Sequence, residues 1–574
     1  MSSRRLNKIG RVALVAAIAA AGFASSASAG GGDHSKKKPR EQLLDLQILA
    51  INDFHGALDP APSSGFGGTG GVQYLATNLR NAEAAAPGKS IIVSAGDLIG
   101  ATPLLSALFH DEPTIEAANL FGLDINAVGN HEFDEGAEEL LRMQRGGTHP
   151  VDGNLDGDPF RGAKFKFLAA NVVVERSGKT LFPPYSIKHV GKGVKVAFIG
   201  MTLDGTPSIV TPSAVAGLRF LDEARTVNRL VPKLRRQGVE SIVVLIHEGV
   251  SGAPGTNEDA CENGLQGALA TIVPALHDEV DVVIAGHTNH EFICNVVDAG
   301  GDSTLVTMAD NNGRLFTDID LKVSTRTRDI SVVAVDNVPN LRTVTPAPDL
   351  QALIDKYKAI SGPLENRVIG QISADIPELP KSPAGESAIG NLIADAQLAS
   401  TAPAELGGAQ IAFMNPGGIR TDAGFVYAGS AAGEGDGNVT YGEAFAVQPF
   451  GNSLVTMTLT GAQIETLLEQ QWSATTTNIL EVSAGFAYTW SAIGPIGDRV
   501  DPGSITFDGA PVDPAASYRV TVNSFLADGG DGFAVLRDGT DRLGGALDVD
   551  SMEDYLIANS PVSPTPLTRI TVVP

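Results

Sequence analysis

Short apolar runs that end in polar residues recur through the first half of the chain. Such runs are typical of strands buried on both faces of a sheet. Between several of them lie stretches with the spacing of helices, residues 71–86 and 224–237. This alternation predicts an α/β fold in which helices cover sheets. The expected strands are residues 46–51, 90–94, 125–128, 167–170, 194–199, 241–246 and 280–285.

The pattern changes over residues 337–349, which are rich in Pro, Thr and Asn. We expect a helix next, at residues 350–360, ended by Ser361, Gly362 and Pro363. Beyond it, a helix at 388–399 and strands at 454–459 and 518–523 are expected. The chain therefore divides into two predicted domains joined by a helix. The expected bounds are 43–336, a linker at 337–362, and 363–574.

The N-terminus has the features of a secretory signal peptide. Four basic residues precede an apolar run at 12–24, and Ala27, Ser28 and Ala29 are small residues of the kind a signal peptidase recognises. We expect residues 1–29 to be removed by cleavage near Ala29, and 30–42 to form a flexible leader. The alternative is an amphipathic N-terminal helix of the fold. No later apolar run is long enough to span a membrane, so we expect an exported, soluble protein, periplasmic or extracellular.

Composition narrows the class of partner. The chain has 66 acidic and 41 basic residues, a formal net charge of −25, with 43% hydrophobic residues. This composition excludes a protein that binds nucleic-acid polymers through a basic face, because such a face needs a concentration of Lys and Arg. A small anionic substrate is compatible with this charge if a local cation or metal ion offsets it. Cys261 and Cys294 are the two cysteines. In an oxidising compartment a disulfide between them is favoured over two separate buried thiols.

Polar residues with the chemistry of metal ligands follow five of the predicted strands. Asp53 and His55, two apart in an extended chain, would point the same way and reach one ion. Each motif alone is equally compatible with an ordinary turn, whereas five in succession indicate a site. Oxygen and nitrogen ligands without thiolates favour Mn, Zn, Fe or similar ions. The motifs are Asn52-Asp53-Phe54-His55-Gly56, Gly96-Asp97, Gly129-Asn130-His131-Glu132-Phe133-Asp134, His247-Glu248-Gly249 and Gly286-His287-Thr288-Asn289-His290.

This order of motifs resembles the calcineurin-like metallophosphoesterases. More narrowly, the chain is similar to the secreted 5′-nucleotidase family, which includes bacterial UDP-sugar hydrolase and animal ecto-5′-nucleotidase. Motifs of the second half carry the same resemblance: Gly390-Asn391-Leu392-Ile393-Ala394-Asp395, Asn415-Pro416-Gly417-Gly418-Ile419-Arg420, Pro449-Phe450-Gly451-Asn452 and residues 524–532. The resemblance implies an N-terminal four-layer α/β/β/α sandwich, a linker helix and an α/β C-terminal substrate-binding domain.

The resemblance also implies two divalent metal ions, such as Mn, Zn or Co, and their ligands. Asp53, His55, Asp97 and Asn289 would hold one ion; Asp97, Asn130, His247 and His287 would hold the other. His290 lies one position beyond the usual ligand and is interpreted as an outer or surface residue. Two such ions can polarise a phosphoryl group and neutralise charge during attack. His131, oriented by Asp134, is the expected catalytic residue, rather than a turn histidine.

In the second domain the resemblance implies substrate contacts. Arg420 would hold charge, Asn415 the base or sugar, and Asp531 a ribose hydroxyl. Phe450 and Phe525 match a pair that sandwiches the base, although most phenylalanines are simply core.

One position departs from the family, because Gly385 stands where an Arg often grips phosphate. Lys381 is the nearest substitute, and substrate preference is open at this point. We therefore expect an exported 5′-nucleotidase that releases phosphate from nucleotides. The alternatives are a UDP-sugar or 2′,3′-cyclic nucleotide hydrolase, and a surface nucleotide-binding or adhesive protein without turnover.

Overall fold

The structure is a computed structural model that describes residues 41–59, 68–252, 254–255, 257–297, 303–420, 424–429, 433–474 and 476–574. The predicted signal peptide, and the leader up to residue 40, lie outside the described residues. Residues 42–574 form one compact unit. None of the described helices combines the length and the apolar character that crossing a membrane requires.

The first sheet of the N-terminal domain has the order β15-β14-β1-β2-β3-β4. Strands β1 to β4 are parallel, and β14 and β15 add to β1 as an antiparallel hairpin. The strands are β1 (Leu43–Ile51), β2 (Lys89–Ser94), β3 (Ile125–Ala127), β4 (Lys166–Leu168), β14 (Leu315–Ser324) and β15 (Ile330–Pro339). The helices of this part are α1 (Val72–Ala85), α2 (Leu104–Ala107), α3 (Glu112–Phe121), η1 (His131–Phe133) and α4 (Ala137–Arg145).

The second sheet has the order β12-β13-β11-β10-β8-β7, with β8, β10, β11 and β13 parallel. Its strands are β7 (Tyr185–Gly191), β8 (Val194–Thr202), β10 (Ser241–His247), β11 (Val280–Ile284), β12 (Glu291–Val297) and β13 (Ser303–Ala309). Its helices are α5 (Thr206–Ile209), η2 (Pro212–Val215), α6 (Glu223–Arg236), α7 (Leu269–Ile272) and η3 (Val273–Ala275). A small sheet is formed by β5 (Val172–Val174), β6 (Lys179–Thr180) and β9 (Leu218–Phe220).

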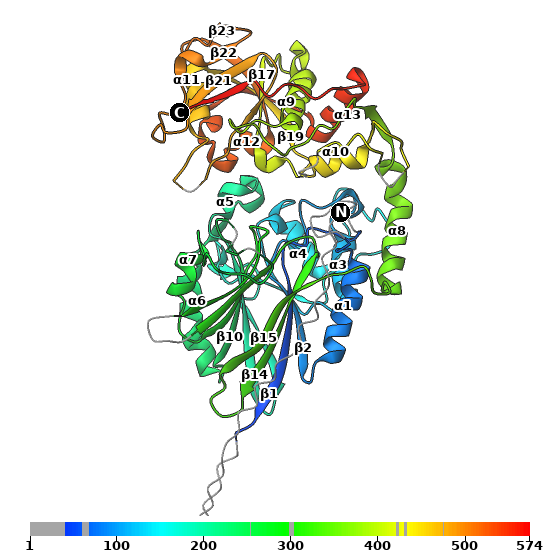
Figure 1. Ribbon diagram of the computed structural model, residues 1–574, viewed down its shortest axis with the longest axis vertical. Coiled ribbons are helices and arrows are strands. Elements are labelled where there is room, and N and C mark those ends of the chain that lie inside the picture. Colours follow the sequence, from blue (N-terminus) through cyan, green and yellow to red (C-terminus); the bar gives the residue numbers. More distant parts are fainter. Residues whose placement is uncertain are drawn as a thin grey trace, which may run out of the picture. The chain divides into compact units, whose positions relative to one another are not determined.

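Three apolar clusters hold these elements in four layers. One cluster, with Ile48, Val93 and Phe198, lies between the two sheets. A second joins the outer face of the first sheet to α1 and α3, and a third joins the second sheet to α6. Figure 1 shows α1 and α3 beside β1 and β2, and α6 beside β10. Central strands such as β2, β10 and β11 are thus buried on both faces, and the expected α/β/β/α sandwich is confirmed.

The C-terminal domain is a second α/β unit. Its main sheet has the order β20-β17-β24-β19-β25, and a smaller one the order β23-β22-β21-β26. The strands are β16 (Val368–Gln371), β17 (Ile411–Met414), β18 (Asn438–Thr440), β19 (Ser453–Thr460), β20 (Glu481–Val482), β21 (Phe486–Ser491), β22 (Thr506–Phe507), β23 (Ala510–Pro511), β24 (Ser517–Asn523), β25 (Thr540–Leu547) and β26 (Ile570–Val573). The helices are α9 (Ala388–Thr401), η4 (Ala404–Leu406), η5 (Pro416–Gly418), α10 (Tyr441–Val447), α11 (Gly461–Glu469), η6 (Pro502–Ser504), α12 (Ser524–Ala527), η7 (Gly530–Gly532), η8 (Ala534–Asp538) and α13 (Asp548–Asn559).

The linker helix α8 (Pro348–Glu365) is longer than expected, because it continues through Pro363. Proline lacks an N–H, but in the last turn of a helix this removes a single backbone hydrogen bond. Asn366 ends the helix, and its backbone N–H and side-chain amide both donate to the carbonyl of Gly362. Near the middle of α8, Tyr357 is buried and its hydroxyl bonds to Glu116 and Asp156 of the N-terminal domain.

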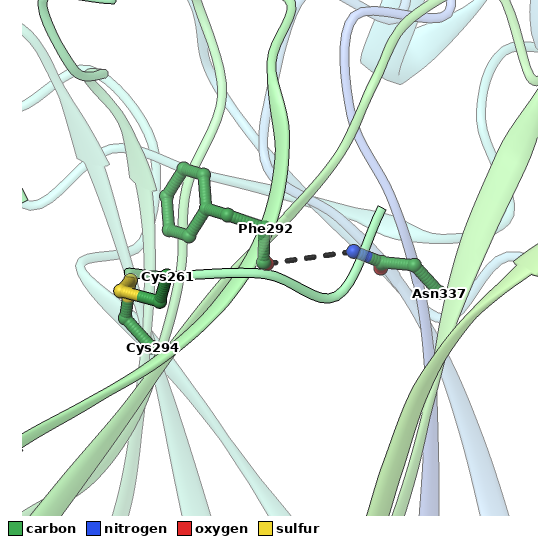
Figure 2. The surroundings of a disulfide bond; sticks show 4 residues. All are labelled: Cys261, Phe292, Cys294 and Asn337. Atoms are coloured by element: carbon green, nitrogen blue, oxygen red, sulfur yellow. Dashed lines mark hydrogen bonds between the residues drawn. A yellow bond between two sulfur atoms is a disulfide. The ribbon is translucent and has the colours of Figure 1, made fainter. Parts of the chain in front are cut away.

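A disulfide joins Cys261 to Cys294 of β12, with 5.4 Å between their Cα atoms. Figure 2 shows it near the hydrogen bond that the side-chain amide of Asn337 donates to the carbonyl of Phe292. The backbone N–H of Asn337 also donates to Asp259, two residues before Cys261. The segment that contains Asp259 and Cys261 is therefore joined to β12 by the disulfide. It is joined to β15 by the hydrogen bond from Asn337.

Candidate active site

The predicted metal-ligand motifs meet where strands of the two sheets end. Asp53 follows β1, Asp97 follows β2 and Asn130 follows β3, whereas His247 ends β10 and His287 follows β11. Ligand sites of α/β proteins occur at the carboxyl ends of parallel strands. The sheets are also linked here by a hydrogen bond from the Thr202 hydroxyl at the end of β8 to the carbonyl of Val128.

Two clusters of ligand atoms share one carboxylate. Asp53, His55 and Asp97 form one, and Asp97, His247 and His287 form the other, each with its ligand atoms within 4.8 Å of one another. Oδ2 of Asp97 lies 2.9 Å from Nε2 of His247 and 3.8 Å from Nε2 of His55. Asp97 therefore occupies the position that a bridging ligand between two cations requires.

Backbone carbonyls fix the orientation of two histidines. Nδ1 of His55 lies 2.8 Å from the carbonyl oxygen of Gly100, and Nδ1 of His247 lies 2.9 Å from that of Ala95. Each Nδ1–H thus donates to a carbonyl, and each Nε2 faces the carboxylate of Asp97. An imidazole held in this way at one nitrogen presents the other as a metal ligand.

The backbone of this site is left-handed at five of the seven predicted ligands. The φ angles are 47° for Asp53, 45° for His55, 50° for Asp97, 77° for His287 and 55° for Asn289. Asp53 and His55 do converge on one cluster, as expected. They do so without strand alternation, because the chain has already turned at the end of β1. Backbone N–H groups of both residues instead donate to carbonyls of the loop after β2.

Close backbone approach explains the glycines beside the ligands. A Cβ on Gly129 would lie 2.2 Å from Oδ1 of Asp97, and one on Gly96 would lie 2.7 Å from Nδ1 of His247. Any side chain at these two positions would push the ligands apart.

The electrostatics of the clusters fit divalent cations. Burial raises the pKa of Asp53 to about 6, although His247 opposes the shift. Burial also favours a neutral Asp97, but His247, His131 and His55 outweigh it and lower its pKa. Among the described residues, Oδ1 of Asn130 is buried without a hydrogen-bond partner. Buried carboxylates beside unpartnered ligand atoms are what a metal ion would satisfy.

His131 and Asp134 form a pair beside these clusters. Nδ1 of His131 lies 2.8 Å from Oδ2 of Asp134, and the backbone N–H of His131 donates to Oδ1 of Asp97 at 3.0 Å. Burial lowers the pKa of His131, but Asp134 and Asp97 outweigh it and raise the pKa above its ordinary value. The imidazole is thus oriented by a carboxylate and placed to donate a proton or a hydrogen bond.

Glu132 is a positioning residue that the sequence reasoning missed. Its buried carboxylate accepts hydrogen bonds from the backbone N–H groups of Asp97, Leu98 and Gly129, and from the side-chain amide of Asn126. The signal was present, since Glu132 is a carboxylate inside a quoted motif. Its role was hidden because it binds backbone rather than metal.

A cavity of about 250 Å³ lies beside the clusters. Residues 209–211, which no sequence pattern singled out, also line it. The predicted site residues among its lining come from both domains: Asn130, His131, Asp134, His287, Asn415, Arg420, Phe450, Phe525 and Asp531.

The C-terminal side of the cavity is organised around Asn415. Its side-chain amide donates to Oδ2 of Asp531 at 2.8 Å, and its carbonyl accepts from Asn523 at 2.9 Å. Burial raises the pKa of Asp531, and the bond from Asn415 opposes that shift. Arg420 supplies a guanidinium to the same cavity, where burial lowers its pKa.

Phe450 and Phe525 are half-buried and line the cavity. The ring of Phe450 stacks on that of His131, with centroids 5.7 Å apart and 18° between the planes. The guanidinium carbon of Arg420 lies 5.6 Å from the centroid of the Phe450 ring. Phe525 packs closely over the backbone of Gly530. The interpretation of Phe450 as a core residue does not hold, because it faces the cavity.

Three further positions named from the sequence, Gly385, Lys381 and Asn289, do not line the cavity described above. Gly385 has a φ of 97°, and a Cβ there would lie 2.8 Å from Ile479, so the backbone disfavours the arginine common in the family. Lys381 pairs with Glu378 at 2.6 Å, and its role as a substitute for that arginine stays a prediction. Asn289 is exposed, and its role as a ligand stays a prediction.

Two family comparisons match the two domains. Residues 46–291 match the family described as calcineurin-like phosphoesterase. Residues 368–538 match 5′-nucleotidase, C-terminal domain. A solved 5′-nucleotidase precursor from Thermus thermophilus is 28% identical, with a TM-score of 0.73 over 92% of this chain and 99% of that chain.

Two curated relatives are longer than this chain. The cell wall protein Lmo0130 of Listeria monocytogenes is 35% identical over 534 residues, covering 88% of this chain and 66% of that protein. The endonuclease YhcR of Bacillus subtilis is 32% identical over 519 residues, covering 88% of this chain and 39% of that protein. The chain thus spans about two thirds and two fifths of their lengths. With both domain families matched in order on one fold, the chain belongs to the calcineurin-like metallophosphoesterases that carry a 5′-nucleotidase C-terminal domain.

Proposed function

We propose that the protein is an exported, metal-dependent 5′-nucleotidase that hydrolyses nucleoside 5′-monophosphates. Water adds to phosphorus, the bond to the 5′-oxygen breaks, and the 5′-oxygen takes up a proton, giving nucleoside and inorganic phosphate. The observation that carries the proposal is the cavity, where His131 and His287 of one domain face Arg420, Asp531 and the aromatic residues of the other.

The ligand atoms around Asp97 are assigned to two divalent cations of the Mn, Zn or Co type. Asp53, His55, Asp97 and Asn289 would hold one, and Asp97, Asn130, His247 and His287 the other. Bound there, such ions polarise the phosphoryl group and supply an activated water. Their support is the carboxylate that both clusters share and the unpartnered side-chain oxygen of Asn130.

His131 is assigned as the catalytic residue that stabilises the developing charge or protonates the leaving 5′-oxygen, and Asp134 as its positioning residue. The 2.8 Å contact between Nδ1 and the carboxylate leaves Nε2 free for this task. Arg420 would bind the phosphate, because two parallel N–H groups of a guanidinium can donate to two phosphate oxygens.

The other end of the substrate is assigned to the C-terminal domain. Asp531, held by Asn415, would accept from the ribose hydroxyls, and Phe450 and Phe525 would stack on the base.

The proposal that the protein is exported has support other than the active-site geometry. The signal peptide at 1–29 and the leader at 30–42 stay proposals, as do the domain bounds 43–336, 337–362 and 363–574. Support comes from the disulfide, which is typical of oxidising compartments, and from the relative named as a cell wall protein.

A substrate panel tests the activity. Chelator-treated protein is reloaded with Mn²⁺, Zn²⁺ or Co²⁺ and offered AMP, UDP-glucose, 2′,3′-cyclic AMP, single-stranded DNA and p-nitrophenyl phosphate. AMP should give the highest kcat/KM, and the Asp97→Asn variant should lose turnover on every substrate. Faster cleavage of UDP-glucose, the cyclic nucleotide or DNA would contradict the proposal, as would full activity in excess chelator.

A further inference from the structure

The loop after β8 reaches the cavity, although it carries none of the predicted metal ligands. It contains α5 and η2, and we call residues 204–215 the α5–η2 segment. Three of its residues, Ile209, Val210 and Thr211, line the cavity. The contacts assigned above to ribose and base come from the C-terminal domain. The α5–η2 segment therefore supplies a wall from the N-terminal domain to which the proposed reaction gives no role.

Packing within the N-terminal domain holds the α5–η2 segment in place. Val210 and Val215 are buried in the apolar cluster that also contains Phe133 of η1. The buried hydroxyl of Thr206 donates to the backbone carbonyl of the third residue before it, at 2.8 Å. Ile209 lies next to Val210 in the chain but is only half-buried. The segment is thus anchored through its valines, and Ile209 is left at the cavity.

The same segment meets the turn that carries Asp531. Helix α5 packs against η7, and Ile209 at the end of α5 lines the cavity together with Asp531. The C-terminal domain fixes η7, because Asn415 donates to Oδ2 of Asp531 at 2.8 Å and Phe525 packs over Gly530. The cavity is therefore bounded near Asp531 by an element of the other domain.

The carboxylate of Asp531 determines which part of a nucleotide faces α5. Among the described residues, Asn415 donates to one of its oxygens, and the other oxygen is left for a ligand. A carboxylate accepts several hydrogen bonds, and two neighbouring hydroxyls can donate them. Ribose hydroxyls bound here point toward η7, and hence toward α5. A group attached to either hydroxyl oxygen must then enter the space beside Ile209.

The side chain of Ile209 is suited to exclude such a group. It branches at Cβ, so few rotamers are open to it and it cannot swing aside as a long flexible side chain can. A site discriminates against a competing ligand when a fixed group occupies the place of the additional atoms. A nucleotide whose ribose oxygens carry only hydrogen does not meet this clash.

We infer that Ile209 is a specificity-determining residue that restricts the site to nucleotides with unsubstituted 2′- and 3′-hydroxyls. This inference rests on the proposed function, because Asp531 orients a ribose only if the substrate is a nucleotide. Ile209 then separates substrates that share a 5′-phosphate. Free mononucleotides are accepted. Nucleotides with a 3′-phosphate, and the 5′ ends of nucleic-acid chains, whose 3′-oxygen carries the next nucleotide, are rejected.

Two AMP analogues test the clash without a change of charge. 2′,3′-O-Isopropylidene-AMP carries a small apolar bridge on both ribose oxygens, so repulsion by the Asp531 carboxylate does not contribute. 2′,3′-Dideoxy-AMP lacks both hydroxyls and measures the loss of their hydrogen bonds without added bulk. The readout is kcat/KM for the dideoxy analogue divided by that for the isopropylidene analogue, from phosphate release by metal-loaded protein. One surplus methylene in a close-fitting pocket costs roughly 10- to 200-fold, so wild type should give a ratio of at least about ten.

The variant Ile209→Ala removes most of the wall. It should lower this ratio at least about fivefold, mainly through faster cleavage of the isopropylidene analogue. The control Ile557→Ala makes the same chemical change on α13, at a side chain that is 60% exposed and does not line the cavity. It should leave the ratio at the wild-type value. Tm is recorded for wild type and both variants.

The outcomes separate this inference from the proposed function. A ratio near one for wild type, or a ratio that Ile209→Ala leaves unchanged, would overturn the inference, while turnover of AMP would still support the proposed function. Absence of phosphate release from AMP would overturn the proposed function and the inference with it. If melting shows that Ile209→Ala does not fold, Ile209→Val, which removes one methyl group at the same place, decides the outcome by the direction in which the ratio changes.

Discussion

The carboxylate of Glu132 accepts a hydrogen bond from the backbone N–H of Asp97 at 2.9 Å, although η1 and the loop after β2 are far apart in sequence. The same carboxylate accepts from Leu98, Gly129 and Asn126. One buried side chain therefore sets the conformation of two loops that present predicted metal ligands.

Replacing Glu132 by alanine should destabilise the protein strongly. It leaves four buried donors without their acceptor, and even one such group costs about 1–3 kcal/mol, so we expect a loss of about 3 kcal/mol or more. Glu132→Gln keeps the shape and one acceptor and should lose less. Urea denaturation of both variants measures this, with Glu138→Ala on α4 as a control. Equal stability of Glu132→Ala and the control would contradict the role.

His131→Ala should lower kcat on AMP by about 10²–10⁴-fold with little change in KM, because its contribution is made in the transition state. Metal content should stay that of wild type. Steady-state kinetics and elemental analysis check both parts. A variant that loses metal along with activity would show that His131 supports the ligands instead.

The aromatic residues should affect nucleotides more than simple esters. Stacking on one aromatic ring contributes about 1–3 kcal/mol, so Phe450→Ala and Phe525→Ala should each lower kcat/KM for AMP by roughly 5- to 150-fold. p-Nitrophenyl phosphate has no base and should be affected far less. The measurement is the ratio of kcat/KM for the two substrates, with Tm recorded beside it. An unchanged ratio with a large fall in Tm would mean that the ring only packs.

The contribution of Glu481 to the free energy of unfolding should decrease as pH rises. Burial raises its pKa from 4.5 to about 8, although hydrogen bonds from Ser387 and the charge of Lys381 oppose the shift. Between these two values the folded state holds a proton that the unfolded chain releases. Its contribution is therefore present below pH 4.5 and is lost as pH rises through about 8.

Glu481→Gln, which cannot ionise, should remove this dependence. The free energy of unfolding of wild type minus that of the variant, measured by urea denaturation from pH 5 to 9, should fall up to about pH 8 and level off above it. A difference that stays flat or rises would show that the carboxylate is ionised in the folded protein.

The disulfide should contribute about 3–4 kcal/mol, as expected for a closed loop that spans a sequence separation of 33 residues. The double variant Cys261→Ser and Cys294→Ser should lower the free energy of unfolding by that amount and keep kcat on AMP. Reductant should destabilise wild type and leave the double variant unchanged. Equal stability with and without reductant would show that the bond contributes nothing.

The sequence predicted the strands of the N-terminal domain well because their apolar runs are continuous. The run predicted at 46–51 is β1 (Leu43–Ile51), and that predicted at 241–246 is β10 (Ser241–His247). Strand β14 was missed because its apolar residues alternate with polar ones instead of forming a continuous run. Strand β15 was missed although residues 330–335 are mostly apolar. The end of α8 was missed because a proline in the last turn removes a single hydrogen bond and does not stop the helix.

Site residues were predictable where chemistry requires a residue type, as for Asp97 and His131. They were not predictable where shape alone matters, as for Ile209 and Val210 of the cavity wall, which carry no polar group. Glu132 lies between these cases, because its type is informative but its partners are backbone atoms.

The left-handed backbone at Asp53, His55, Asp97, His287 and Asn289 has a consequence for how this site tolerates mutation. Asp, Asn and His are the side chains that adopt positive φ most readily after glycine, and they are also the oxygen and nitrogen donors that metal ions select. The backbone conformation and the metal coordination therefore each select the same few residue types: Asp, Asn and His. A β-branched or apolar replacement fails both, and an Asp→Glu change keeps the charge but loses the conformational preference. Replacing a carboxylate by its amide keeps the backbone and alters the donor alone, so Asp→Asn is the substitution that isolates the chemistry of each position.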